Sequence, residues 1–461
     1  MIEPPADAPL TATDATPKYS KWYRRWVLFL VLLVYIFGFI DRAVLSTVGQ
    51  AVKQDLGMTD FQLGILGGVA FALCNAMFVI PIARLAERKS RVLIISVALA
   101  FWSLMTAASA GAQNFWHLAL ARLGVGAGEA GGISPSQSLL SDYYPPHQRA
   151  GTIGIYMLGV GIGVIVGSVT TAWVAEHWGW RQAFLVVGLP GLLLALMIFL
   201  TVREPPRGHS EGLAPSTEPA PPLKAVIAHL RSKPSFFHFL AASTLVSSCG
   251  SGNVTFLHPY FVREYQLSYT EAAWLFGLIN SVGPAVAYFF GGLLTDKLAK
   301  MDSRYYGWVP GTAMMIGMPL AMLGLVQGSW QMAFAILLLP GMFTGTYFGP
   351  TYAAANNMSP PRMRATTAAF LLFANLFGLA AGPALVGFIS DLFTSYTFAL
   401  GDFQALCPGG TSLDPAMAEE CRASSARGIR YGLMVGALGY GWAGIHFFLA
   451  SRTLRKDIIQ H

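Results

Sequence analysis

The feature that most constrains this chain is a succession of apolar stretches, each long enough to cross a bilayer. A spanning helix needs about 20 mostly apolar residues. A mean hydropathy of +0.52, with only 11% charged residues, places the whole chain in the membrane class. The sequence therefore predicts an all-α membrane protein with twelve transmembrane helices in two six-helix bundles. The expected spans are 24–48, 61–81, 91–111, 115–139, 151–174, 182–202, 236–261, 270–294, 307–327, 331–354, 365–390 and 428–450.

Polar segments divide the chain into five parts. The N-terminal tail is rich in Pro, Ala and Thr and is expected to be disordered, and six prolines with several charges mark a linker in the middle of the chain. We expect a short amphipathic helix near 223–232 at the end of this linker. The predicted parts are a tail 1–23, an N-terminal bundle 24–202, a linker 203–233, a C-terminal bundle 234–451 and a tail 452–461.

The distribution of Lys and Arg predicts the orientation in the membrane. Most of the 30 Lys and Arg residues lie in the tails, the linker and the loops that share their side. Cytoplasmic loops carry such an excess, so both termini are expected in the cytoplasm. The net charge of +7 therefore reflects membrane topology and does not indicate nucleic-acid binding. We expect a multi-pass protein of a bacterial plasma membrane. The opposite side holds Lys53, Arg181, Arg263, Arg422, Arg427 and Arg430.

Two charges lie inside the fourth apolar stretch, Arg122 and Glu129. Each charge at the bilayer centre costs about 2.5–3.5 kcal/mol, so an anchoring helix would not be expected to carry two. Their spacing places them on one stripe, about 10.5 Å apart along the axis, which is too far for direct contact. Burial disfavours the charged form of a carboxylate, so Glu129 is a candidate for proton coupling. The alternative is a fixed ion pair with a base on another helix.

A second charged pair, Asp41 and Arg42, lies in the first span. Adjacent residues point about 100° apart on a helix, so the two would meet different partners. In one arrangement Asp41 meets Arg122 and couples protons, while Arg42 faces the cavity or Glu129 and binds a phosphate or carboxylate. Arg122 would then either bind an anionic headgroup or merely neutralise Asp41. The alternative is that Asp41 and Arg42 are interfacial charges at the outer end of the span.

A weak internal repeat relates the two halves. The loops at 83–91 and 292–300 both place an acid before a base between two spans. Two parallel six-span halves are the architecture of one large class of secondary transporters. The loops resemble the Gly-x-x-x-Asp-Arg/Lys-x-Gly-Arg signature of the major facilitator superfamily. The first copy departs from that signature at Ala83, Glu87 and Ser90, whereas the second keeps Gly292, Asp296 and Lys297.

Four short motifs carry a closer likeness: 39–42 (Phe-Ile-Asp-Arg), 126–130 (Gly-Ala-Gly-Glu-Ala), 142–145 (Asp-Tyr-Tyr-Pro) and 178–184 (Trp-Gly-Trp-Arg-Gln-Ala-Phe). These motifs resemble the spinster family of lysolipid and sphingosine-phosphate transporters. The resemblance implies movement of amphipathic lipids, with proton coupling in some members. Related sugar-acid and organic-anion transporters also carry an Asp-Arg pair in the first span.

The superfamily resemblance also implies gating roles for loop residues. Glu87, Arg88, Asp296 and Lys297 would latch the two halves together on the inner side, and Arg88 is expected to pair with Asp142 at the end of span four. The alternative is that these charges only set the topology.

Polar side chains in the second half are candidates to line the cavity. These are Ser247, Asn253, Asn280 and Asn375, although ordinary hydrogen bonding between helices would also explain them. Cys407 and Cys421 share a long polar loop on the outer side, where an oxidising compartment would allow a disulfide, and the sequence leaves the pairing open.

The predicted function is secondary active transport by alternating access. We expect a monomer in the lipid bilayer that moves a lysophospholipid or sphingosine-phosphate-like lipid, is driven by a proton gradient and needs no cofactor or metal. A symporter of small organic anions such as sugar acids is the first rival, and a passive lipid scramblase or a non-transporting receptor is the second. An intramembrane enzyme is remote because no metal-ligand spacing or nucleophile–base pair stands out.

Overall fold

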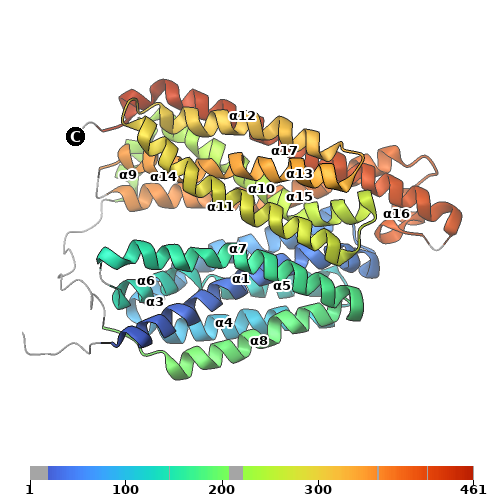
Figure 1. Ribbon diagram of the computed structural model, residues 1–461, viewed down its shortest axis with the longest axis horizontal. Helices are drawn as coiled ribbons and strands as arrows, with labels where there is room; N and C mark the ends of the chain where they lie inside the picture. Colours follow the sequence, from blue (N-terminus) through green and yellow to red (C-terminus); the bar gives the residue numbers. More distant parts are fainter. Residues whose placement is uncertain (1–18, 145, 207–221, 361–362, 413, 460–461) are drawn as a thin grey trace, which may run out of the picture.

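The computed structural model describes residues 19–459 apart from 145, 207–221, 361–362 and 413, and the regular elements within these ranges are helices. Two groups of helices lie side by side with their long axes roughly parallel (Figure 1). The first group, the N-half, contains eight helices: α1 (Lys21–Leu56), α2 (Asp60–Gly67), α3 (Val69–Arg88), α4 (Arg91–Ala108), α5 (Phe115–Glu129), α6 (Ile133–Tyr143), α7 (Pro146–Trp178) and α8 (Trp180–Thr201).

The second group, the C-half, follows the linker and its short helix α9 (Leu223–Arg231), which lies at the predicted amphipathic segment. Val226 and Leu230 of α9 are buried against the C-half. The helices of the C-half are α10 (Pro234–Tyr265), α11 (Tyr269–Ala299), α12 (Tyr305–Leu325), α13 (Trp330–Thr344), α14 (Phe348–Asn357), α15 (Arg364–Thr397), α16 (Phe403–Leu406) and α17 (Pro415–Asp457).

The helices cross the molecule in an order that agrees with the predicted fold. Among the described residues, ten helical segments are long and apolar enough to span a membrane, with α2–α3 and α13–α14 each counted as one segment. Two further crossings are made by α5 with α6, which have 15 and 11 residues, and by α10, which has 32. The result is an all-α membrane fold of two six-span bundles.

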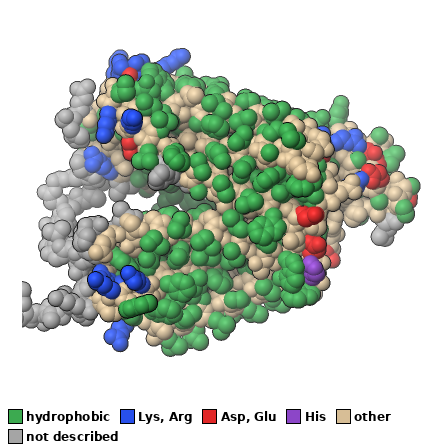
Figure 2. Space-filling model, in the orientation of Figure 1, with side chains coloured by type: hydrophobic (Ala, Val, Ile, Leu, Met, Phe, Trp, Pro, Cys, Tyr) green, Lys and Arg blue, Asp and Glu red, His purple; other side chains and the backbone are tan. Residues whose placement is uncertain are grey.

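The two ends of the molecule are easily distinguished in Figure 1. The start of α1, the linker and the end of α17 lie at one end, which we call the linker side. The loop that contains α16 lies at the other end, which we call the disulfide side. Lys and Arg side chains gather at the linker side of both halves (Figure 2).

Among the described residues, the largest shared part of the apolar core joins the halves toward the disulfide side. One buried cluster combines residues of the N-half such as Val44 and Leu63 with residues of the C-half such as Phe256 and Val386. The other large clusters each lie mainly within one half. Figure 2 shows the consequence as a cleft between the halves that opens at the linker side.

Two helices are longer than the sequence predicted. α1 reaches Leu56, where Gly57 with a φ of 62° ends it, and α17 has 43 residues. Apolar composition marks the part of a helix in lipid but not its continuation into the polar ends of the molecule.

Candidate substrate cavity and charge clusters

Four charged side chains inside the N-half form two ion pairs. Nε and a terminal nitrogen of Arg42 on α1 contact Oε2 of Glu129 on α5, at 2.8 and 2.7 Å. Asp41 accepts a hydrogen bond from Thr106 on α4 and one of 3.3 Å from Arg122 on α5. Asp41 and Arg42 thus reach different partners, because neighbouring side chains leave a helix about 100° apart. We call Asp41, Arg42, Arg122 and Glu129 the cavity cluster.

The cavity cluster lies deep in the molecule. Asp41 has 2% of its surface exposed. α1 continues to Leu56, which at 1.5 Å per residue is about 21 Å beyond Arg42. Asp41 and Arg42 do not extend to the end of the helix as snorkelling charges would, because their side chains pair with Arg122 and Glu129 inside the N-half.

Each ion pair leaves one buried polar atom without a hydrogen bond to the described residues. These atoms are Oε1 of Glu129 and Nε of Arg122. A buried polar atom without a partner costs about 1–3 kcal/mol. The cluster is therefore able to take up a further proton or a ligand oxygen with a gain in hydrogen bonding.

A cavity of about 420 Å³ lies next to this cluster, between the two halves. Arg42 and Arg122 both line it, but 31% of the Arg42 side chain is exposed against 4% for Arg122. The cavity therefore offers chiefly one cation to a ligand.

Aromatic rings hold the Arg42 guanidinium at the cavity wall. Its central carbon lies 5.0 Å from the ring centre of Phe39 and 5.1 Å from that of Phe71, and Phe39 packs edge-on against Tyr35. A ring face attracts a cation within about 6 Å. These rings keep the charge near the cavity while leaving its remaining N–H groups available.

The wall contributed by the C-half is polar in places but uncharged among the described lining residues. Three of the residues predicted to line the cavity do line it, namely Ser247, Asn253 and Asn280. Asn280 donates to the backbone oxygen of Phe276, so part of its polarity is used within its own helix. The wider lining of the C-half is mainly aliphatic and aromatic, including Val246, Leu257, Phe276, Ile279, Leu325, Leu337 and Tyr347.

Asn375, the fourth residue predicted to line the cavity, lies behind the wall. Its side chain bonds Tyr347 and Tyr352, at 3.3 and 3.4 Å, and its backbone oxygen accepts from Ser247. Asn375 lies on the side of α15 that packs against other helices. The sequence does not reveal this, because α15 is apolar on all sides and has no polar face to mark the cavity. Its contact with Tyr347 makes it a support for a residue that does line the cavity.

The predicted partner of Asp142 is wrong. Asp142 pairs with Arg91, the first residue of α4, whereas Arg88 is exposed. Arg91 is almost fully buried because it also bonds Glu204, Ser138 and the backbone oxygen of Pro205. The start of α4 faces α6, while Arg88 at the end of α3 points to the outside.

The other predicted gating residues are not brought together. Asp296 and Lys297 are exposed near the end of α11, and the side chain of Glu87 lies outside the described residues. Hydrogen bonds that join described residues of the two halves lie at the disulfide side and near mid-depth, for example from Ser281 to the backbone oxygen of Gly161. Latching at the linker side stays a prediction.

Sequence reasoning missed a second four-charge group at the disulfide side. Lys53 and Asp60 of the N-half meet Arg263 and Asp391 of the C-half. We call these four residues the closing cluster. The sequence places Lys53 and Arg263 among the charges on the same side of the membrane, and this shared side is its one hint that they meet.

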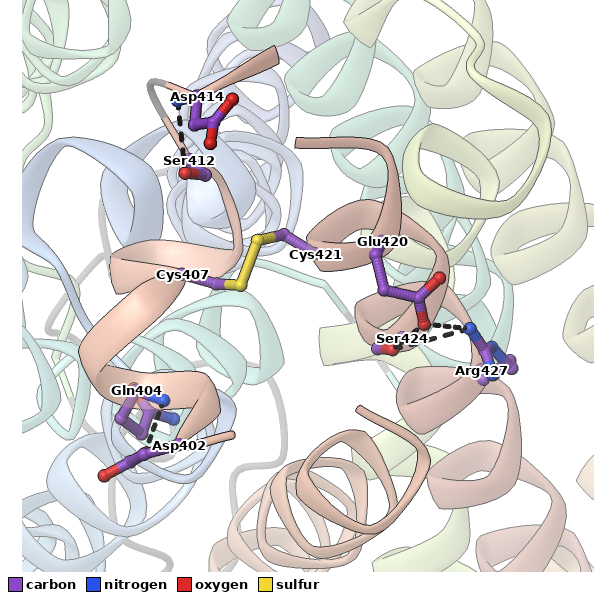
Figure 3. Close-up of a disulfide and its surroundings, with 9 residues drawn as sticks. All are labelled: Asp402, Gln404, Cys407, Ser412, Asp414, Glu420, Cys421, Ser424 and Arg427. Atoms are coloured by element: carbon purple, nitrogen blue, oxygen red, sulfur yellow. Dashed lines mark hydrogen bonds and ion pairs between the residues drawn. A yellow bond between two sulfur atoms is a disulfide. The ribbon is translucent and has the colours of Figure 1, made fainter. Parts of the chain in front are cut away.

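The outer loop between α15 and α17 is closed by a disulfide between Cys407 and Cys421, the pairing that the sequence left open. Figure 3 shows that the bond ties the segment around α16 to the first turns of α17. Glu420, next to Cys421, forms an ion pair with Arg427, about two turns further along α17. The loop is thereby held as one unit against the C-half.

Comparison with known proteins identifies the family. The sequence profile described as Major Facilitator Superfamily matches residues 31–321 and 240–401, which together make up most of the chain. The chain belongs to the Major Facilitator Superfamily. The superfamily consists of transporters, so this facilitator is a multi-pass membrane transporter and not an enzyme.

Three relatives show where the facilitator lies within the superfamily. An MFS-type efflux pump of Mycolicibacterium smegmatis is 28% identical, covering 98% of this chain and 99% of that protein. Protein spinster homolog 1 of Xenopus tropicalis is 26% identical over 80% of this chain and 74% of its own length. A gallate transporter of Pseudomonas putida is 25% identical, covering 85% of this chain and 91% of the transporter. Spinster proteins and an acid transporter are thus both among its relatives.

A solved structure has the same fold. It is a bacterial homologue of the human lysosomal transporter Spinster in an inward-facing, unoccupied conformation, with a TM-score of 0.86 and 32% identity. The match covers 96% of the facilitator and all of that chain. The facilitator is therefore close to spinster.

Proposed function

We propose that this facilitator moves a lysophospholipid or a sphingosine-phosphate-like lipid by alternating access, coupled to protons. The observation that carries the proposal is the position of Arg42. Its guanidinium is partly exposed to a cavity and also holds Glu129, so a substrate anion and the Glu129 carboxylate compete for the same cation. Guanidinium suits phosphate because its N–H groups match two oxygens at once.

Charge balance supports the coupling. The cavity cluster contains two acids and two bases, so it is neutral without substrate. An anionic headgroup would leave the site with a net negative charge, which is costly away from water. Protonation of Glu129 restores neutrality and releases Arg42 toward the headgroup. Protonation of Asp41 would release Arg122 in the same way.

The uncharged wall of the C-half supports an amphipathic substrate. A single exposed cation on one side and a mainly apolar wall on the other match a molecule with one charged end and a hydrocarbon chain. Ser247 and Asn253 provide hydrogen-bonding groups between these two regions.

A small organic anion is the second candidate. The relationship to a gallate transporter favours it, and Arg42 would bind a carboxylate as well as a phosphate. This candidate needs only the polar region of the cavity, so soluble acids should compete and lysolipids should not.

The first experiment measures flux into proteoliposomes that contain the purified protein under an imposed pH gradient. Labelled lysophospholipid and labelled gallate are compared for the wild type, Glu129→Gln and a matched control, Glu419→Gln. Glu419 is an exposed acid on the disulfide side, with 71% of its side chain exposed. We expect lysolipid flux that follows the gradient in the wild type and control, and flux in Glu129→Gln that no longer responds to pH.

The other outcomes decide between the candidates. Gallate movement alone would replace the lipid by an organic anion and keep the coupling. Lysolipid movement that ignores the gradient in every variant would indicate a passive scramblase. Unchanged pH dependence in Glu129→Gln would remove Glu129 from the coupling step.

We further propose a monomer in a bacterial plasma membrane, with both termini in the cytoplasm and the proton gradient as driving force. The Lys and Arg excess at the linker side supports this orientation (Figure 2). The disulfide on the opposite side supports it too, since disulfides persist in oxidising compartments.

A further inference from the structure

The two halves meet most closely where α2 of the N-half crosses α15 of the C-half. A side chain at Gly64 would lie 2.2 Å from the backbone oxygen of Pro383, so the helices touch backbone to backbone. Gly387, one turn further along α15, approaches the backbone oxygen of Asp60 in the same way. This contact brings the first turn of α2 against the C-half.

The first turn of α2 has only half of its hydrogen-bonding needs met within the N-half. The amide groups at the start of a helix have no partners within the helix. A capping box satisfies two of them, since Thr59 Oγ accepts from the backbone N–H of Gln62 and Gln62 Oε1 accepts from that of Thr59. The amides of Asp60 and Phe61 remain.

Asp391 of the C-half satisfies these two amides. Its Oδ1 accepts from the backbone N–H of Asp60 at 2.9 Å, and its Oδ2 accepts from that of Phe61 at 2.7 Å. A carboxylate is favourable at this position because the amides and the helix dipole present positive charge. The N-terminal cap of α2 is therefore completed by the other half of the protein.

The side chain of Asp60 ties the halves together at the same place. It accepts hydrogen bonds from Lys53 of its own half and from Arg263 and Ser390 of the C-half, each at 2.7 Å. Lys53, Asp60 and Arg263 are all buried. Three of these four bonds cross between the halves, and charge-assisted bonds of this length to a buried carboxylate make the contact strong.

The charges are arranged so that the halves can part. Each half contributes one acid and one base, Lys53 with Asp60 on one side and Arg263 with Asp391 on the other. Separation leaves neither half with a net charge, and the ion pair of Lys53 with Asp60 lies wholly within the N-half. What separation removes is the cap of α2 and the bonds from Arg263 and Ser390.

The disulfide-closed loop covers this contact from the outside. Gly409 has a φ of 68°, and a side chain there would lie 2.9 Å from the backbone of Lys53 and Gln54. Gly410 lies beside the Lys53 ammonium and Ser425, and Ser425 accepts from Arg263. The loop, which belongs to the C-half, thus rests on the end of α1 and keeps water from the ion pairs.

We infer that Asp391 is the residue that holds the disulfide side closed, by capping α2 across the two halves, and that the disulfide-closed loop shields this latch. The inference rests on the alternating access of the proposed function, because only a transporter that opens at this side needs a releasable contact. It assigns Asp391 as a positioning residue, which touches α2 and not the substrate.

The test measures the distance across the disulfide side in the purified full-length protein, without substrate or gradient. Nitroxide labels are placed at Gln113→Cys in the N-half and Gly328→Cys in the C-half, two exposed loop positions, after Cys74 and Cys249 are changed to Ser. Asp391→Asn keeps the shape of the side chain but leaves one oxygen to accept from two amides. We expect the ratio of open to closed molecules to rise roughly tenfold in this variant.

Controls separate a latch from a general loss of structure. Asp402→Asn changes an exposed Asp in the same outer region that bonds only within its own loop, and it should match the wild type (Figure 3). Asp391→Glu keeps the charge and should restore much of the closed population. Cys407→Ser with Cys421→Ser should shift the ratio in the same direction by a smaller factor. If Asp391→Asn fails to fold, Ser390→Ala is used instead, because it removes one donor to Asp60. The ratio of open to closed molecules should then rise by a smaller factor.

The outcomes distinguish this inference from the proposed function. Equal distance distributions in Asp391→Asn and Asp402→Asn, while transport persists, would overturn the latch alone. A single distance in every variant would overturn the latch together with alternating access. The identity of the substrate affects neither result.

Discussion

The cavity cluster and the closing cluster contain the same charges in different surroundings. Each has two acids and two bases, and in each cluster three of the four residues are buried. The cavity cluster lies within one half and leaves two buried polar atoms without a hydrogen bond to any described residue, with Arg122 at 3.3 Å from Asp41. The closing cluster spans both halves, and its Asp60 carboxylate accepts four bonds of 2.7 Å.

This difference in hydrogen bonding separates two uses of buried charge. A cluster with unpaired atoms beside a cavity can exchange partners with a ligand or a proton. A cluster whose bonds are all made within the protein gains nothing from a ligand and serves to hold surfaces together.

The same substitution in both clusters should have very different effects on stability. Arg263→Lys loses the paired contact with Asp60 and the bond to Gln50, so we expect the free energy of unfolding to fall by about 2–4 kcal/mol. Arg42→Lys keeps one contact with Glu129 in a partly exposed site and should lower it by less than about 1 kcal/mol. Chemical denaturation in detergent micelles measures both. Equal losses would mean that the two clusters do the same structural work.

For the rate of transport we expect the larger effect at Arg42, whereas for stability we expect it at Arg263. Arg42→Lys removes the planar group that pairs with two oxygens, so we expect the rate of lysolipid uptake at limiting substrate to fall roughly tenfold or more. Uptake is measured in proteoliposomes at matched protein content, with Arg422→Lys, a partly exposed Arg of the outer loop region, as control. A variant that transports normally would show that Arg42 does not hold the substrate.

A partly exposed ion pair at the linker side, between Arg455 and Asp302, provides the reference for both clusters, and its effect should be the smallest. The hydrogen bond from Arg455, with help from Arg304, holds the pKa of Asp302 well below its usual value. Stability from this pair is therefore present above the ordinary Asp pKa of about 4 and is lost as the pH falls toward the lowered value. Asp302→Asn should melt slightly below the wild type at pH 7, and the gap should close in acid. A gap that widens in acid would contradict this sign.

Much of the fold was predictable because lipid imposes a simple demand on sequence. Long apolar stretches, a Pro-rich linker and the asymmetry of Lys and Arg were enough to predict two six-span bundles in a membrane. The loops at 83–91 and 292–300 and the motif around Glu129 also indicated the superfamily and its spinster branch, which the comparisons confirm.

The candidate site was predictable only in part. Buried charges such as Asp41 and Glu129 stand out in an apolar sequence, and their helical directions indicated which pairs could form. The predicted partner of Asp142, Arg88, was wrong, and the partner is Arg91. The two arginines are three positions apart, but α3 ends and α4 begins between them, so their side chains point in different directions. Thr106 gave no signal, since a Thr in a span usually bonds its own helix.

By itself the sequence determined the class of protein, the number of spans and the presence of buried charge in the N-half. These follow from the free energy of transfer into lipid, which each segment meets on its own. Only the tertiary structure decided that Asp391 would cap α2, that Asp60 would meet Arg263 and that Asn375 would stand behind the cavity wall. The first two contacts join residues more than 200 positions apart and depend on how the two bundles approach each other. The third depends on packing among the helices of the C-half. No local pattern in the chain records either arrangement.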